Sequence, residues 1–507
     1  MKSQIMDTSP RIVPDGRTLN TVAVVQLADG SARLDGPSPA ALSRVEGSWH
    51  AARELALAGR VYGRNTGVGA NRTDAVRAAV RADGDVDVDA TAEGHGLRLL
   101  RSHAGAVGSP LPAREVRAML AVRANQLLAG GAGLNPEIVL ALLDAVRNGA
   151  HPVVREHGAV GTGDLAALAQ TGLALLGEQP WTGGAPAPRT VALDGNDALA
   201  FISSNALTLG QSALALDELR RLQDASLVVA ALSLLAVGGS YEAYAEPVHR
   251  ERPHPGSVAA AARMRTVLGA PARPGPPSGR IQDPYGFRCV PQIHGPALES
   301  AGKLDEVLAV DLNAAAENPL ISADSQGVYG ALHHGSFYAA HAAAALDGLR
   351  LAVLQTARLS TARLVSLVEP GITGLRPFLS EDIPASSGVM ILEYAAGSAL
   401  AELTSLAQPA SLGHAVLSRG VEEVASFASL AARHALRMPE YHRHVLACEL
   451  VAAVRALRQR DTVPDPALPV GRAYELAAAE LDPDMTDRPL SDDVDVAVGL
   501  LDRLAVL

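Results

Sequence analysis

Cysteine is nearly absent from this 507-residue chain, which contains only Cys289 and Cys448. Two cysteines do not make the disulfide framework of a small secreted protein, so a reducing compartment is the simplest expectation. The N-terminal stretch MKSQIMDTSPRIVPDGR also lacks the continuous apolar core of a signal peptide. We therefore expect a cytoplasmic protein.

Aromatic residues are scarce as well, at 3%, although 48% of the residues are hydrophobic and the long apolar segments are rich in Ala, Leu and Val. This composition favours helices packed on helices over a β-sandwich. The chain has no excess of basic residues, and its formal net charge of -11 argues against a nucleic acid or an anionic membrane as partner. The most apolar run, Ala225 to Gly239, is too short to span a membrane, so we expect a buried helix there.

The sequence changes character near residue 200. Before it, Gly and Pro interrupt short helical runs, whereas from Asn205 onward the runs are long and their apolar residues recur every three or four positions. We predict a mainly α fold with a loop-rich N-terminal helical domain over 1–200 and a central long-helix bundle with C-terminal helices over 201–507. The Pro- and Gly-rich segment GAPARPGPPSGRIQDPYGFRCVPQIHGP is expected to be a loop docked on this bundle.

In the stretch HGAVGTGDLAALAQ, Thr162 stands between Gly161 and Gly163. One interpretation is a helix N-terminus, with Asp164 or Thr162 as the capping residue before LAALAQ. The other is special backbone chemistry, because two glycines give conformational freedom and Thr162 supplies a β-hydroxyl that can leave as water.

Other polar clusters have both a functional and a structural interpretation. Arg288 is suited to bind a carboxylate beside Tyr285, but an Arg–Asp surface pair next to a packed tyrosine would explain the same residues. VYGRNTGVGANR is a weak phosphate loop, and the His103 of LLRSHAGAVG is, taken alone, more typical of a structural histidine. We expect no metal site at the HRH sequence, because its two imidazoles point in different directions on a helix.

Taken in order, these stretches resemble the aromatic amino acid ammonia-lyases and aminomutases, the family of histidine ammonia-lyase. VYGRNTGVG is similar to the family pattern Y-G-x-N-T-G-F-G, RSHAGAVG to S-H-A-A-G-V-G, and GAVGTGDLAALA to G-S-V-G-A-S-G-D-L-A-P-L-A. RIQDPYGFRCVPQIHG resembles R-x-Q-D-x-Y-S-x-R-C-x-P-Q-V-x-G, and AAAENPLI resembles N-x-x-x-D-N-P-L. The resemblance covers about residues 16 to 435 and implies the family's helical fold.

The resemblance also implies a prosthetic group made by the chain itself. In the family an Ala-Ser-Gly triplet cyclises, when the glycine nitrogen attacks the alanine carbonyl and two waters leave, to give an electrophilic methylidene-imidazolone (MIO). The matching residues here are Gly161, Thr162 and Gly163, which would give a ring with an extra methyl group. That methyl would make the reactive carbon more hindered and less electrophilic. No metal and no dissociable cofactor is implied.

Further residues match family positions with assigned roles. By resemblance, Tyr62 is the base that removes the substrate β-proton and Arg288 binds the substrate carboxylate. Such a base would need its phenol pKa lowered from about 10, which a cation and helix N-termini would provide. The other matches are Tyr285 and Gln282 (lining the ring), Phe337 (packing near it), Glu422 (near the substrate amine), Ser102 and His103 (substrate selectivity), and either Asn205 or Ser203 for the ring-contacting asparagine.

The resemblance therefore predicts a carbon–nitrogen lyase that removes ammonia from an aromatic or heteroaromatic L-amino acid, with histidine or tyrosine favoured, to give an α,β-unsaturated acid. It also implies a homotetramer in which three subunits contribute loops to each site. Two alternatives stay open, an aminomutase and a ring-free relative that binds an amino acid or catalyses a different reaction in the same pocket. A noncatalytic helical scaffold would leave Tyr62 and Arg288 unexplained.

Overall fold

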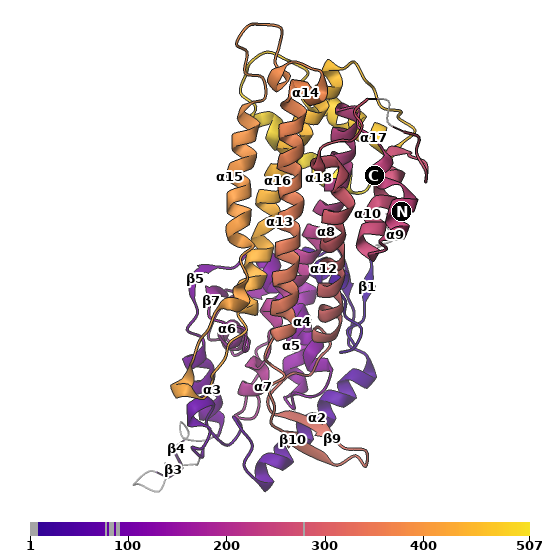
Figure 1. Ribbon diagram of the computed structural model, residues 1–507. Coiled ribbons are helices and arrows are strands. Elements are labelled where there is room, and N and C mark those ends of the chain that lie inside the picture. Colours follow the sequence, from indigo (N-terminus) through magenta and orange to yellow (C-terminus); the bar gives the residue numbers. More distant parts are fainter. Residues whose placement is uncertain (1–8, 77–78, 81–85, 88–91, 277–278) are drawn as a thin grey trace, which may run out of the picture. The chain divides into compact units, whose positions relative to one another are not determined.

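The computed structural model describes residues 9–76, 79–80, 86–87, 92–276 and 279–507. Helices dominate this part of the chain (Figure 1), which confirms the mainly α prediction. Its strands are short and pair two by two, and only β1 with β2 is a parallel pair.

The helices are α1 (Thr21–Asp29), α2 (Pro39–Ala58), α3 (Ala92–His103), α4 (Ala113–Leu128), α5 (Pro136–Asn148), α6 (Leu165–Leu175), α7 (Ala198–Ile202), α8 (Ala206–Ala236), α9 (Glu246–Glu251), α10 (Pro255–Leu268), α11 (Tyr285–Arg288), α12 (Val290–Asp311), α13 (Ala340–Val368), α14 (Pro370–Thr373), α15 (Ile391–Leu406), α16 (Ala428–Gln459), α17 (Pro469–Glu480) and α18 (Ser491–Ala505). The strands are β1 (Arg11–Ile12), β2 (Arg33–Leu34), β3 (Ala79–Val80), β4 (Val86–Asp87), β5 (Val107–Pro110), β6 (Ala150–Pro152), β7 (Arg155–His157), β8 (Trp181–Gly183), β9 (Leu320–Ala323) and β10 (Tyr329–Leu332).

Local sequence explains where several helices begin and end. The Asn135 side chain accepts a hydrogen bond from the Glu137 N–H, and Pro136 occupies the first helical position of α5. Gly149 ends that helix in a left-handed conformation with φ of 72°, which glycine adopts without a steric penalty. The side chains of Asn20 and Ser38 cap the starts of α1 and α2 in the same way.

The chain forms two compact units, each made of three separate segments. Unit 1 comprises Met1–Leu214, Asp305–Leu346 and Ala410–Arg433, and unit 2 comprises Ala215–Leu304, Asp347–Pro409 and His434–Leu507. The boundary predicted at residue 200 divides the chain into two continuous domains. In the structure, Asp305–Leu346 and Ala410–Arg433, which come after that boundary, belong to unit 1 together with the N-terminal segment.

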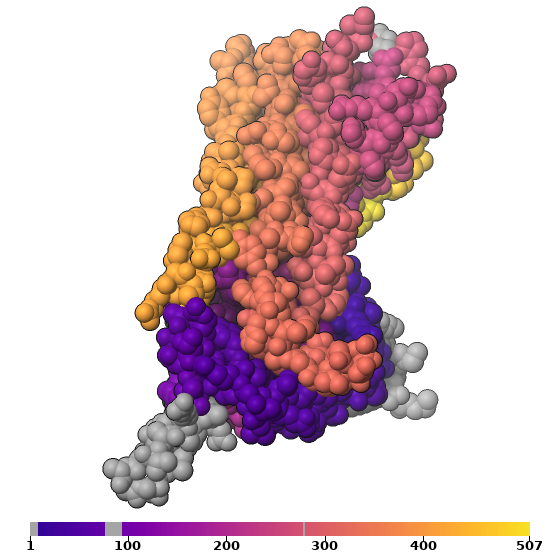
Figure 2. All heavy atoms as spheres, turned by 60° about the horizontal axis from the view of Figure 1, so that its bottom comes forward, coloured from indigo at the N-terminus to yellow at the C-terminus, as the bar shows by residue number. Residues whose placement is uncertain are grey.

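In unit 1 a buried ion pair joins residues distant in the sequence. Arg123 of α4 lies 2.7 Å from the Glu317 carboxylate and also donates to the carbonyl of Phe201. The β9–β10 hairpin packs on α2, and Ile321 forms a buried apolar cluster with Ala51 and Ala52. Figure 2 shows this later part of the chain lying against the indigo N-terminal part. The two contacts anchor the segment after Asp305 against the N-terminal helices.

Unit 2 is a bundle in which long helical segments lie side by side (Figure 1). Its core is built mostly from Ala, Leu and Val, and one fully buried ion pair, Arg363–Glu449 at 2.6 Å, crosses it. By length and composition alone, the apolar helical segment Ala198–Ala236 could cross a membrane. This segment is longer than the apolar run Ala225 to Gly239 identified in the sequence. The most apolar window of that segment is entirely buried in the protein, as expected for a core helix.

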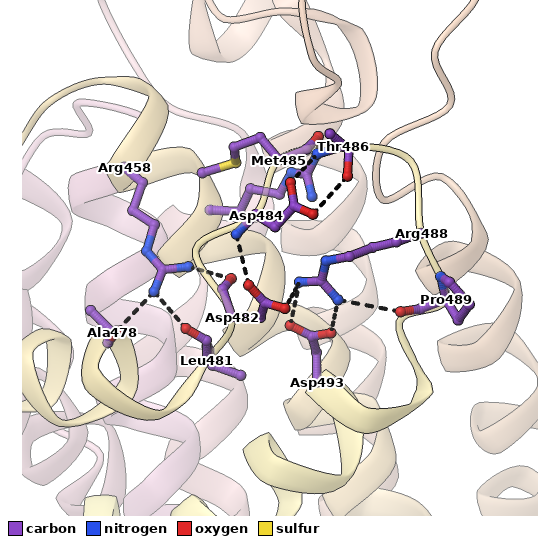
Figure 3. A network of polar contacts seen from close by, with 11 residues as sticks. Arg458, Ala478, Leu481, Asp482, Asp484, Met485, Thr486, Arg488, Pro489 and Asp493 are labelled. Carbon is purple, nitrogen blue, oxygen red and sulfur yellow. Dashed lines mark hydrogen bonds and ion pairs between the residues drawn. The ribbon is translucent and has the colours of Figure 1, made fainter.

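Arginines hold the loop between α17 and α18 in unit 2 (Figure 3). Arg458 donates to the carbonyls at the end of α17, and Arg488 binds the Asp493 carboxylate through two nitrogens. Asp484 accepts from the backbone and hydroxyl of Thr486, which lowers the pKa of its exposed carboxyl. These contacts fix the C-terminal helix onto the bundle.

Candidate active site

The Gly161-Thr162-Gly163 triplet lies in the loop between β7 and α6, in unit 1. Gly161 has φ of 86° and Gly163 has φ of 121°, conformations that residues with a side chain rarely adopt. The two glycines are thus required by the backbone path around Thr162. The Thr162 side chain is half-buried, and within the described residues its hydroxyl has no hydrogen-bond partner.

The residues that begin α8 hold the C-terminal side of the triplet. The Gly163 N–H donates to Asn205 Oδ1 at 3.1 Å, and the Asn205 Nδ2 group donates to the Phe337 carbonyl at 2.7 Å. Ser203, the other match for the ring-contacting asparagine, instead accepts from the Asn318 N–H through its hydroxyl. Of the two matches, Asn205 is the residue that contacts the triplet.

A second segment, 426–429, holds the N-terminal side. The Ser426 hydroxyl donates to the Gly161 carbonyl at 2.8 Å, and the Ala339 N–H approaches the same oxygen at 3.3 Å. The Phe427 N–H donates to the Val160 carbonyl at 2.8 Å. The triplet is therefore fixed on both sides by residues far away in the sequence.

Asp164 is the residue that precedes α6, as the helix-cap interpretation predicted, but its side chain makes no capping hydrogen bond. The carboxylate accepts instead from the backbone N–H and the hydroxyl of Thr208, at 2.8 and 2.9 Å. Burial raises the pKa of Asp164 to about 6, although these hydrogen bonds oppose the shift. The cap interpretation was right about the position and wrong about the function of the side chain, because the buried carboxylate finds stronger donors on α8.

Tyr62 and Glu422 come together in the same unit. The Tyr62 hydroxyl accepts a hydrogen bond from the Gly69 N–H at 2.7 Å, and the Ala70 N–H donates to the Ser418 hydroxyl at 2.9 Å. Glu422 pairs with Leu417 through the backbone, and its carboxylate is exposed close to Gly69. The 418–422 turn thereby places a carboxylate beside the tyrosine loop.

The electrostatics of Tyr62 differ from the sequence-based expectation of an acidified phenol. Burial raises the pKa of Tyr62 above 10, and the Glu422 charge raises it further. The Gly69 N–H lowers the pKa by more than Glu422 raises it, and Arg72 lowers it as well, but the pKa stays above 10. The expectation of an acidified phenol was wrong for the single chain, because burial dominates.

Ser102 and His103 end helix α3 in unit 1. The His103 Nδ1 atom lies 2.9 Å from the Leu99 carbonyl, which only accepts, so Nδ1 carries the hydrogen and Nε2 is the acceptor in the neutral ring. The Ser102 hydroxyl also donates to Leu99. Among the described residues, no hydrogen bond connects His103 to Tyr62 or to the triplet.

Gln282, Tyr285 and Arg288 belong to unit 2. Gln282 and Tyr285 are exposed, and the Arg288 guanidinium carbon lies 4.8 Å from the centroid of the Tyr285 ring. Asp283 is buried and pairs with Arg280 at 2.7 Å, not with Arg288. The surface-pair interpretation of Arg288 was wrong, because Arg288 Nε donates to the Asp283 carbonyl and not to its carboxylate.

Sequence reasoning missed several residues that hold the site. Ser426 and Ser418 lie in or beside RGVEEVASFAS, where only Glu422 was recognised, and Thr208 lies within a helical run. A hydroxyl that makes one hydrogen bond to a distant residue leaves no periodic pattern, so none of these three residues could be recognised in the sequence.

In the HRH sequence, His442 is fully buried and burial lowers its pKa to about 4, whereas His444 is only half-buried.

Comparison with known proteins gives the family of the chain. The family described as aromatic amino acid lyase matches residues 19–479. Histidine ammonia-lyase from Geobacillus thermodenitrificans is 35% identical over 93% of this chain and 94% of its own length. The crystal structure of histidine ammonia-lyase from Trypanosoma cruzi is 27% identical, covers 98% of this chain and 94% of its own, and has a TM-score of 0.86. Ergothionase from Treponema denticola, solved with desmethyl-ergothioneine sulfonic acid, is 25% identical with a TM-score of 0.87, over 98% and 99% of the two chains. The resemblance predicted from the motifs is confirmed, and the chain belongs to the aromatic amino acid lyase family.

Proposed function

We propose that this protein is a cytoplasmic ammonia-lyase that converts an aromatic or heteroaromatic L-amino acid, histidine or tyrosine before phenylalanine, into an α,β-unsaturated acid and ammonia. The observation that carries the proposal is the held triplet, in which the Gly161 carbonyl accepts from Ser426 and the Gly163 N–H donates to Asn205. Membership of the family and the pairing of Tyr62 with Glu422 in the same unit support it.

The residues of the triplet fit an MIO-type group. Gly163 has no side chain of its own beside its amide nitrogen, the Gly161 carbonyl has two hydrogen-bond donors, and Thr162 keeps a β-hydroxyl. When formed, the ring supplies an electrophilic carbon that converts the substrate amino group into a better leaving group. No metal is part of this proposal, and within the described residues no three His, Cys, Asp or Glu side chains are grouped to hold one.

Tyr62 is the proposed base for the substrate β-proton. As the phenolate takes this proton, the electron pair forms the carbon–carbon double bond and the Cα–N bond breaks. The Gly69 N–H stabilises the phenolate, because it donates to the phenolic oxygen. Burial is the main cause of the raised Tyr62 pKa, and a substrate ammonium near Glu422 would offset the smaller part that the Glu422 charge adds.

Two further residues have proposed roles in substrate binding, and one of them sets the selectivity. Arg288 binds the carboxylate common to all amino acids, by two parallel hydrogen bonds. The free Nε2 of His103 accepts a hydrogen bond, which the imidazole of histidine or the phenol of tyrosine provides and the ring of phenylalanine does not. We further propose a homotetramer whose subunits share loops at each site; the exposed apolar residues Ile391 and Tyr394 on α15 support association.

The decisive experiment is the mass of the 157–170 peptide together with amino acid turnover. We expect the loss of two waters and release of ammonia from histidine or tyrosine. Thr162→Ala should abolish both, because alanine has no hydroxyl to lose. Thr162→Ser is the matched control, which restores the hydroxyl without the methyl and should retain both.

An unmodified peptide in an active preparation would favour the alternative, a ring-free relative that uses the same pocket. That candidate is motivated by Thr162, whose extra methyl hinders the reactive carbon. An aminomutase is the second alternative, and it would give a β-amino acid in place of free ammonia.

A further inference from the structure

The Gly161 carbonyl is unusually well held for a loop carbonyl. The Ser426 side chain that donates to it is 4% exposed, so water does not compete for the hydrogen bond. The Ala339 N–H points at the same oxygen. Two donors converging on one carbonyl oxygen match the arrangement that stabilises a developing oxyanion.

The same serine also explains the glycine at position 161. A Cβ atom built on Gly161 would lie 2.1 Å from Ser426 Oγ and within 3 Å of the backbone nitrogens of Phe427 and Ala428. The family triplet has an alanine methyl where this chain has none. Gly161 and Ser426 are therefore a matched pair, in which the missing methyl leaves room for the hydroxyl.

We propose that Ser426 assists ring closure of the triplet by polarising the Gly161 carbonyl and stabilising the oxyanion that forms on it; this inference rests on the proposed function. Ser426 contacts the reacting group directly, because its hydroxyl donates to the oxygen of the Gly161 carbonyl whose carbon is attacked. Its role ends once the ring exists, so it is separate from the turnover of substrate.

The bond changes of the step balance without an outside reagent. The Gly163 nitrogen forms a bond to the Gly161 carbonyl carbon, and the negative charge moves to the oxygen held by Ser426. That oxygen leaves as the first water with the protons from the Gly163 and Thr162 nitrogens. The Thr162 hydroxyl leaves with the Thr162 α-proton as the second water, which creates the exocyclic double bond.

Ser429 provides a matched control on the same segment. Its hydroxyl is 3% exposed and donates to the Ala159 carbonyl at 2.9 Å, so Ser429→Ala also deletes one buried hydrogen bond to the loop. The Ala159 carbonyl does not react. A purely structural role of the 426–429 segment would make the two alanine variants equivalent.

The test follows dehydration of the full-length chain after a short pulse of cell-free synthesis, by the mass of the 157–170 peptide. We expect Ser426→Ala to lengthen the half-time of water loss ~100-fold, toward the lower end of what one oxyanion donor contributes, because the Ala339 N–H remains. Ser429→Ala should stay within about threefold of wild type. Ser426→Cys, which keeps a side chain with a weak donor, should be intermediate.

The Gly161→Ala variant provides a second test of the inference. Its methyl would clash with the Ser426 hydroxyl as well as with the backbone nitrogens of Phe427 and Ala428, so it should slow dehydration too. Because part of this effect acts through the hydroxyl, the slowing of the Gly161→Ala/Ser426→Ala double variant relative to wild type should be smaller than the product of the two single effects.

Three results would overturn the inference. Equal half-times for Ser426→Ala and Ser429→Ala, with a dehydrating wild type, would remove the role of Ser426 and leave the proposed function intact. Multiplying effects in the double variant would show that the two residues act independently. A wild-type chain that never loses water would refute ring formation, and with it the step that Ser426 assists.

Discussion

Opposing influences act on the pKa of the Tyr62 phenol. Burial and the Glu422 charge raise the pKa of its phenol, whereas the Gly69 N–H and Arg72 lower it. The ring also contacts His333 edge to face, with centroids 6.4 Å apart. The aromatic ring and the phenolic oxygen thus have separate functions, packing and proton transfer, and a single substitution can separate them.

Tyr62→Phe keeps the ring and removes the oxygen. We expect kcat for histidine or tyrosine to fall ~10²- to 10⁴-fold, the usual contribution of a general base, with a smaller change in KM. The mass of the 157–170 peptide should equal that of wild type, since Tyr62 does not contact the triplet. Tyr338→Phe, a change of the same kind at another half-buried tyrosine of unit 1, is the control. Full activity of Tyr62→Phe would assign the base elsewhere.

His103→Phe tests the selectivity assignment. The substitution removes the Nε2 acceptor, so the imidazole N–H of histidine or the phenol O–H of tyrosine loses its partner. The preference for these two substrates over phenylalanine should therefore drop by about 1–3 kcal/mol, the cost of leaving a buried donor unpaired. The measurement is kcat/KM for the three amino acids. Ser102→Ala, which keeps the imidazole and its contact with Leu99, should change the ratios much less. An unchanged preference in His103→Phe would refute the assignment.

At the scale of elements, α6 and α7 both begin at a buried aspartate that does not cap its helix through the side chain. A helix N-terminus favours a carboxylate, yet burial raises the pKa of Asp164 to about 6 and that of Asp197 to about 7, the latter with help from Asp194. Desolvation therefore outweighs the helix dipole at both positions.

These shifts predict a pH dependence of the stability of unit 1. A carboxyl whose pKa is higher in the folded than in the unfolded chain binds its proton more tightly when folded. The contribution of Asp164 to stability should therefore be fully present below about pH 4 and fall by about 3 kcal/mol as Asp164 ionises toward pH 6, whereas Asp15 and Asp35, whose pKa values are lowered, act in the opposite direction at low pH. Asp164→Asn should flatten this decrease in hydrogen exchange of the α6 amides. Asp197→Asn should flatten the part that extends to pH 7, and an unchanged slope in both variants would contradict the assignment.

The sequence predicted the elements better than the contacts between them. Periodicity and composition gave the helical fold, and five ordered motifs gave the family, because both are local patterns. The hydrogen bonds from Ser426 to Gly161 and from Thr208 to Asp164 join distant residues through one hydroxyl each. Their existence depends on how the chain folds back, which no local pattern records. The pKa of Tyr62 was mispredicted for the same reason, since burial of its phenol, the main cause of the shift, depends on how the chain folds around it.

At the scale of the whole molecule, the chain leaves large apolar side chains on its surface, among them Ile391 and Tyr394 of α15. We expect sedimentation to give the mass of four 52.3-kDa chains. Tyr394→Glu should shift the distribution to smaller species with an unchanged far-UV spectrum, because a buried charge at an interface is costly. Val463→Glu, at an exposed loop residue after α16, is the control. A monomeric wild type would contradict the expectation.

The three-segment construction of unit 1 also sets an order of events during synthesis. The Gly161 carbonyl is held by a residue 265 positions further along the chain. At roughly 5–20 residues per second, a ribosome needs on the order of ten to fifty seconds to reach that residue after it has made the triplet. During this interval the triplet lacks the Ser426 donor, although the Ala339 N–H, which lies earlier in the chain, approaches the same oxygen. A nascent or truncated chain should therefore mature slowly, and rapid maturation of the site reports that the end of unit 1 has been made and has folded.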